Sequence, residues 1–101
     1  MPPKKTYPIH MGEKLNFQLP LLDKDGRSKG YLYLQHQKRP KDLPRIGETV
    51  VLLGGSDYLE GKVLEVCHSN FFNSATLRFD PVTYSWRTIL QEHDNNWQYM
   101  E

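Results

Sequence analysis

Several features that would assign a function to a small protein are scarce in this chain. It has one cysteine, Cys67, so no intramolecular disulfide can form, which fits a reducing compartment. No apolar run approaches the roughly 20 residues that span a bilayer, and residues 1–13 lack the apolar segment of a signal peptide. We therefore expect a soluble, cytoplasmic protein without a membrane partner.

Groups of residues that would indicate catalysis or metal binding are also missing. Cys67 and His68 are adjacent, so on a strand they point to opposite faces, and Cys67 is expected to be a small, buried, apolar side chain. Glu60 and Glu65 are an odd number of residues apart, so they cannot act together from one face of a strand. The histidines are too widely separated for the closely spaced ligand pairs of a zinc site; they are His10, His36, His68 and His93. The sequence therefore predicts a protein that is not an enzyme and binds no metal or cofactor.

An alternating pattern predicts a first strand over residues 15–21. The alternating apolar residues are Leu15, Phe17, Leu19 and Leu21. This is the period of a half-buried strand. Because Pro20 has no N–H for a sheet ladder, we expect this strand to lie at an edge or to have that side unpaired. Turn residues follow over positions 23–30.

The second predicted strand, residues 31–37, carries different side chains on its two faces. Leu32 and Leu34 share one face, and Tyr31 and Tyr33 share the other. We favour the orientation that places the leucines in the core and leaves the tyrosines partly exposed, with their hydroxyls available. The alternative orientation places the rings in the core.

Residues 44–66, PRIGETVVLLGGSDYLEGKVLEV, predict a β-hairpin at the centre of the fold. Residues 46–48 turn the chain into the run 49–53, which is apolar on both faces and suits a central strand. Residues 58–68 return as the second strand, and Gly61 within it indicates a bulge or a sharp bend.

The remaining sequence predicts further strands, and together the predicted strands define the fold class. Residues 75–79 alternate, residues 82–90 are interpreted as a long final strand, and residues 91–101 as a last edge strand or a strap over the domain. The fold class is all-β: a small antiparallel barrel of about five to seven strands with no major helix. It is expected to occupy residues 14–101 as one domain, after a mobile arm over residues 1–13.

Residues 46–66 resemble the SH3-like small-barrel pattern of KOW and Tudor-type modules. A Gly-acid pair, Gly47-Glu48, opens a strand, a glycine ends the loop, and a Gly-x-Val strand beginning at Gly61 returns. The resemblance implies an SH3-like barrel, and such barrels bind RNA, DNA, peptides and folded proteins, so it favours a binding module. The aromatic cage of methyl-lysine readers cannot be assigned in this sequence.

Charge is unevenly distributed along the sequence, although the net charge is +1. Residues 1–45 contain ten basic and four acidic residues, a net charge of +6, whereas residues 46–101 contain three and eight, a net charge of −5. Such asymmetry is compatible with a surface that has two binding faces. The favoured interpretation is that strands from the two halves interleave in a barrel and their charges neutralise one another.

Aromatic and basic residues around the hairpin form the candidate partner-binding site. They are Tyr31, Tyr33, Lys38, Arg39, Lys41, Arg45, Phe71 and Phe72. The favoured hypothesis is that the chain binds another protein and acts as an inhibitor, immunity factor or adaptor, because tyrosine and arginine are preferred interface anchors. The alternative is RNA or DNA binding through phosphate contacts and stacked tyrosines, against which the pI of 7.9 argues. In a third interpretation the tyrosines line the core and the lysines are merely solvated.

Overall fold

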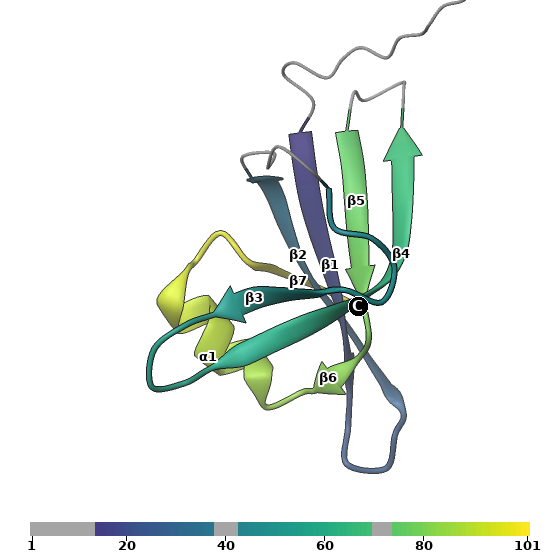
Figure 1. Ribbon diagram of the computed structural model, residues 1–101. Coiled ribbons are helices and arrows are strands. Elements are labelled where there is room, and N and C mark those ends of the chain that lie inside the picture. Colours follow the sequence, from purple (N-terminus) through teal and green to yellow (C-terminus); the bar gives the residue numbers. More distant parts are fainter. Residues whose placement is uncertain (1–13, 38–42, 70–73) are drawn as a thin grey trace, which may run out of the picture.

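The computed structural model describes residues 14–37, 43–69 and 74–101, and most of these residues belong to one sheet (Figure 1). In chain order the elements are β1 (Lys14–Leu22), β2 (Ser28–Gln37), β3 (Thr49–Leu53), β4 (Leu59–Ser69), β5 (Ser74–Phe79), β6 (Val82–Thr83), α1 (Trp86–His93) and β7 (Gln98–Met100). The predicted all-β class is confirmed.

The sheet is mixed, with the strand order β3-β4-β5-β1-β2-β7 and with β6 paired to β1. The ladders β1–β2, β2–β7, β3–β4 and β4–β5 are antiparallel. The prediction of an antiparallel sheet is wrong for β1, which runs parallel to both β5 and β6. These strands follow β1 in the sequence only after β2 and the β3–β4 hairpin, so they are not joined to β1 by a tight turn. Among the described residues no ladder joins the two end strands, β3 and β7, so closure into an SH3-like barrel stays a prediction.

Pro20 lies in an interior strand, at a gap between two neighbours of β1. β5 pairs with β1 from Lys14 to Gln18, and β6 pairs with it from Leu21 onwards. The missing N–H of Pro20 therefore interrupts no ladder on that side. Of the two expectations for Pro20, the edge position is wrong and the unpaired side is confirmed.

β2 has the favoured orientation. Leu32 is fully buried and Leu34 is 4% exposed, whereas Tyr31 and Tyr33 on the opposite face are half-buried. The leucines pack in the core because they have no polar group that needs water or a partner. The tyrosines are therefore available at the surface.

The entry to β3 is a turn whose geometry depends on glycine. The Glu48 N–H donates to the Arg45 carbonyl over 3.0 Å, and Gly47 has a φ of 93°, as in a type II turn. The Gly47 N–H donates to the Val63 carbonyl, and the Val63 N–H donates to the Glu48 carbonyl, both over 2.8 Å. This is a bulge with a glycine in the left-handed region, and it sets the register in which β3 meets β4.

β4 bends where it changes partner. It pairs with β3 over residues 59–62 and with β5 from Val63 onwards, and Figure 1 shows the β3–β4 hairpin turned across the other strands. Gly61 is buried at this bend, and a Cβ added there would lie 2.7 Å from Leu52 Cδ1 and 2.8 Å from Phe79 Cδ1. The bend predicted near Gly61 is confirmed, and close packing explains the glycine.

The prediction that residues 49–53 form a central strand is wrong. β3 is an end strand of the sheet. Leu53 is 8% exposed, but Val51 is 54% exposed. Val50 and Leu52 pack against the core from one face, and an irregularity between Val51 and Leu53 lets Leu53 pack there as well. The apolar run therefore does not indicate burial on both faces.

The long final strand predicted over residues 82–90 is also wrong, because only β6 is extended and α1 follows it. Trp86, Ile89 and Leu90 are spaced three and four residues apart and share one face of the helix. Leu90 is fully buried, and the other two pack partly against the core. Trp86 and Leu90 also fit a strand period, but Ile89 shares their face only in a helix, so the helix brings all three to the core.

β7 is an edge strand, which confirms one of the two expectations for residues 91–101. Arg87 joins α1 to it: Nη1 donates to the Tyr84 hydroxyl over 2.6 Å, and Cζ lies 3.9 Å from the centre of the Tyr99 ring. The Tyr99 hydroxyl donates to the Lys29 carbonyl over 2.7 Å. These contacts fix the end of the chain against the start of β2.

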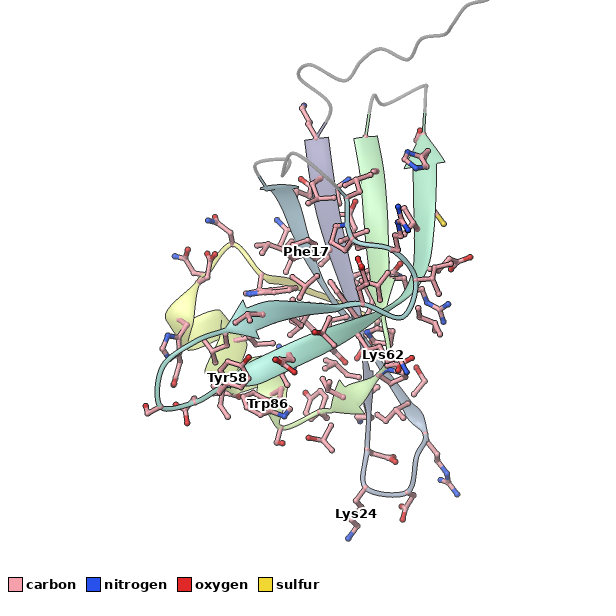
Figure 2. The ribbon with its side chains drawn as sticks, in the orientation of Figure 1. Phe17, Lys24, Tyr58, Lys62 and Trp86 are labelled. Carbon is pink, nitrogen blue, oxygen red and sulfur yellow. The ribbon has the colours of Figure 1, made fainter. Side chains whose placement is uncertain are left out.

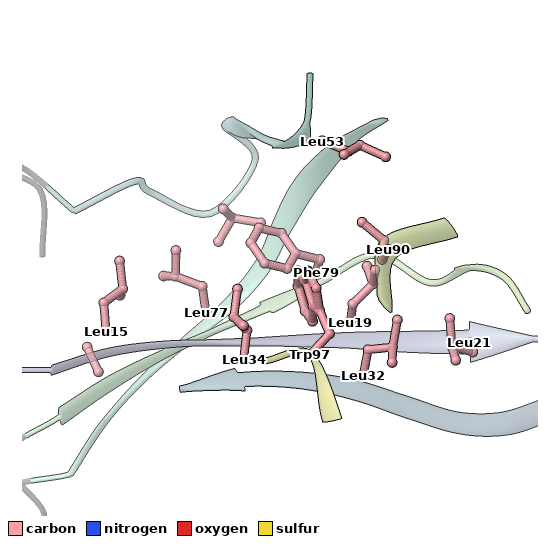
Figure 3. Packing of buried hydrophobic residues seen from close by; sticks show 12 residues of the cluster. Leu15, Leu19, Leu21, Leu32, Leu34, Leu53, Leu77, Phe79, Leu90 and Trp97 are labelled. Carbon is pink, nitrogen blue, oxygen red and sulfur yellow. The ribbon is translucent and has the colours of Figure 1, made fainter. Parts of the chain in front are cut away.

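The core occupies one side of the sheet (Figure 3). Its buried residues are Leu15, Leu19, Leu21, Leu32, Leu34, Leu53, Val63, Ala75, Leu77, Phe79, Leu90 and Trp97. Phe17 joins two of them, with its ring 5.4 Å from Phe79 at 80° and 6.4 Å from Trp97. Because β1 and β5 direct alternate residues into this core, their remaining side chains lie on the opposite face.

Candidate functional site

The face of the sheet opposite the core carries mostly polar side chains from four adjacent strands, and we name it the polar face. Its residues are Lys14, Asn16 and Gln18 of β1, Tyr31, Tyr33 and Gln35 of β2, Ser74, Thr76 and Arg78 of β5, and Glu65, Cys67 and Ser69 of β4. Thr76 pairs in register with Cys67 on one side and with Asn16 on the other. The pairing of β4, β5, β1 and β2 therefore assembles this surface from distant parts of the sequence.

A pocket of about 350 Å³ lies on the polar face, and we name it the polar pocket. Its lining residues are Lys14, Asn16, Tyr33, Gln35, Ser69, Ser74 and Thr76. They supply one ammonium group, hydroxyls and side-chain amides, and none of these described lining residues is acidic. Asn16, Gln35 and Ser69 already have partners, so the donors that the pocket offers to a ligand come from its other lining residues.

Ser74 is the most informative residue of the polar pocket. It is only 7% exposed, yet its hydroxyl has no side-chain hydrogen bond to the rest of the described chain. Buried hydroxyls nearly always have a partner. The Ser74 residue lines the polar pocket, so its hydroxyl can donate to water or to a ligand there.

The charged pair on the polar face is already neutralised. Arg78 donates from Nη1 to Glu65 Oε1 over 3.3 Å, and both side chains are about half exposed. Exposed ion pairs of this kind contribute about 0–1 kcal/mol to stability. Lys14 is consequently the charged residue of the polar pocket that remains unpaired within the described structure.

The structure brings together some of the residues predicted for partner binding. Tyr31 and Tyr33 are both on the polar face, and Tyr33 lines the polar pocket. Arg45 is exposed in the turn before β3, and Leu43, two residues earlier, packs against the core cluster on the other side of the sheet. Arg45 is therefore not beside the tyrosines.

The other predicted site residues lie outside the described residues: Lys38, Arg39, Lys41, Phe71 and Phe72. The strand ends that flank them are described. Gln37 pairs with Leu15, Ser69 pairs with Ser74, and Ser74 pairs with Lys14. These described strand ends lie at the end of the sheet where the polar pocket is.

Two sequence-based expectations about the site need correction. Cys67 was expected to be buried, but it is exposed, because it faces outward beside Thr76 in the β4–β5 ladder. The polar lining of the pocket was also missed. The available signal was the polar half of the alternation in β1, where Lys14, Asn16 and Gln18 occupy every second position.

The described ranges contain neither a metal-binding cluster nor a helix long enough to cross a membrane. No group of three or more histidine, cysteine, aspartate or glutamate side chains there could hold a metal ion. The helix in the described part of the chain is too short to cross a membrane. Comparison of the chain with protein-family models, curated proteins and solved structures finds no significant match.

Proposed function

We propose that this chain is a non-enzymatic binding module whose partner is another protein, held on the polar face. The observation that carries the proposal is the placement of Tyr31 and Tyr33, half-exposed and opposite the core, next to a pocket of hydrogen-bond donors. Tyrosine combines a large apolar ring with a polar tip and is a preferred interface residue. An inhibitor, an immunity factor and an assembly adaptor all act in this way.

A cytoplasmic location belongs to the same proposal. Cys67 is a free thiol and exposed. An exposed free cysteine suits a reducing compartment, where thiols persist.

A protein partner is favoured over RNA or DNA by the charge of the polar face. Its described cations are Lys14 and Arg78, and Arg78 is already paired with Glu65. Nucleic-acid binding depends on several lysines or arginines that neutralise phosphates. The pI of 7.9 likewise lies below the value typical of a nucleic-acid-binding domain.

The test compares two tyrosines in one binding assay. Proteins retained from a lysate of the native source by the wild-type chain are identified, and the purified partner is then titrated by calorimetry. We expect Tyr33→Ala to weaken binding at least tenfold, about 1.4 kcal/mol. Tyr58→Ala is the matched control, because Tyr58 is 52% exposed but lies on the β3–β4 hairpin.

Two results contradict the proposal. One is equal affinity of the wild type and Tyr33→Ala, with equal melting temperatures. The other is binding to random RNA or DNA that weakens steeply with salt while no protein is retained.

A further inference from the structure

We infer that the polar pocket receives an acidic side chain of the partner and binds its carboxylate through Lys14 and Ser74. This inference rests on the proposed function, because it names the group that the protein partner inserts. It assigns a ligand class to a pocket lined by residues of all four polar-face strands.

The donors and acceptors of the pocket define the ligand. The Lys14 ammonium and the Ser74 and Thr76 hydroxyls have no hydrogen-bond or ion-pair partner within the described residues. A carboxylate accepts several hydrogen bonds and donates none. It therefore matches a pocket that offers donors, one positive charge and no acidic lining residue.

The burial of Ser74 adds a second reason. The residue is only 7% exposed, yet it lines the polar pocket. A ligand oxygen there replaces pocket water as the acceptor, and a hydrogen bond to a charged acceptor is stronger than one to a neutral acceptor. A carboxylate at this position therefore satisfies a donor that has no partner among the other described residues.

Size and charge limit the ligand to one side chain. A volume of about 350 Å³ is at the small end of ligand pockets. One unpaired lysine suits one negative charge.

The experiment uses sodium glutarate as the probe and does not need the partner. Glutarate is titrated into the isotopically labelled protein, and backbone amide shifts are recorded by NMR. We expect saturable shifts centred on Ser74, Thr76 and Tyr33 with a dissociation constant in the millimolar range, and none with uncharged glutaramide. Methyl phosphate forms a second arm, and tighter binding of methyl phosphate overturns the carboxylate assignment.

Three variants locate the binding. Lys14→Gln is expected to weaken glutarate binding about tenfold. Lys24→Gln is the matched control, because Lys24 lies at the tip of the turn between β1 and β2 (Figure 2); it should bind glutarate like the wild type. Ser74→Ala should weaken binding severalfold while the melting temperature stays unchanged, since no intramolecular hydrogen bond is lost.

Other results overturn the inference. Equal losses in Lys14→Gln and Lys24→Gln mean a diffuse charge effect. A fall in the melting temperature of Ser74→Ala means that the hydroxyl has a structural partner. If glutarate binds as expected but Tyr33→Ala leaves partner binding intact, the proposed function fails and the carboxylate site stands. If Tyr33→Ala fails to bind the partner but glutarate causes no amide shifts in the wild type, the proposed function stands and the carboxylate site fails.

Discussion

The packing of the β3–β4 hairpin on the sheet depends on the absence of a side chain at Gly61, so Gly61→Ala is a sensitive test of the fold. The added Cβ would lie 2.7 Å from Leu52 Cδ1 and 2.8 Å from Phe79 Cδ1. Ordinary carbon contacts begin near 3.5 Å, so the hairpin must move away by several tenths of an ångström or a core ring must shift. Phe79 is fully buried and has little room to move.

The magnitude follows from two opposing effects. Overpacking a core by one methyl group costs about 1–3 kcal/mol. Replacing glycine restricts the unfolded chain and returns about 0.4–1 kcal/mol. At the midpoints of these ranges the net loss for Gly61→Ala is about 1.3 kcal/mol, which lowers the melting temperature by roughly 5–10 °C in a domain of this size.

The assay is urea unfolding, monitored by circular dichroism, of the wild type and four variants: Gly61→Ala, Gly54→Ala, Leu52→Val and the Gly61→Ala/Leu52→Val double variant. Gly54→Ala is the matched control in the same hairpin, since a Cβ there meets nothing within 4 Å; its free energy of unfolding should equal or slightly exceed that of the wild type. Adding Leu52→Val to Gly61→Ala removes one clashing atom and should recover part of the loss, a coupling that a double-mutant cycle measures. If Gly61→Ala is as stable as Gly54→Ala, the described packing of the hairpin is wrong.

Three further predictions concern other parts of the fold. Gly30→Ala should destabilise the protein by more than about 1 kcal/mol in urea unfolding, because Gly30 has a φ of 81° and an added Cβ would collide with the backbone of β7; unchanged stability would contradict that contact. The pKa of Tyr58 lies above the usual value near 10, first because its hydroxyl donates to the Glu60 carboxylate and further through desolvation and the negative charge of Glu60. The Tyr58–Glu60 hydrogen bond therefore stabilises the fold below pH 10, and this stabilisation is lost as the pH rises through the raised pKa. Ultraviolet titration of Glu60→Gln should show a lower pKa of Tyr58 than in the wild type. Arg87→Lys should lower the free energy of unfolding by about 1 kcal/mol, since the guanidinium stacked over the Tyr99 ring is lost. A melting temperature of this variant equal to that of the wild type would argue against the contact.

Local patterns predicted the strands whose two faces differ clearly. Leucines alternating with polar residues predicted β1, and alternating leucines and tyrosines predicted both the position and the orientation of β2. The turn before β3 was also readable, because Gly47 must adopt a positive φ there. In each case the determinant lies within a few residues of sequence.

The failures have a different physical cause. Trp86 and Leu90 fit both a helix period and a strand period, whereas Ile89 joins them on one face only in the helix, and all three pack on or against the core. Val51 is as apolar as Val63, which is buried, yet Val51 is exposed because it faces away from the core against which its neighbours Val50 and Leu52 pack. Propensity and period do not encode which strand becomes an end strand.

The candidate site was predicted only in part for the same reason. The polar pocket depends on the parallel pairing of β1 with β5, which joins residues 60 positions apart, such as Lys14 and Ser74. A serine at the start of a strand has no distinctive local pattern. Tyr33 was found because a large aromatic side chain opposite a leucine face is conspicuous in sequence.

The most direct test of the central claim, that the polar face binds a protein partner, is photo-crosslinking from defined positions. A benzophenone amino acid is introduced at Tyr33 or, as the control, at Tyr58, which is on the β3–β4 hairpin and 52% exposed. The proposal predicts a partner crosslink from position 33 and none from position 58. A crosslink from position 58 alone, or equal yields from both, would contradict it.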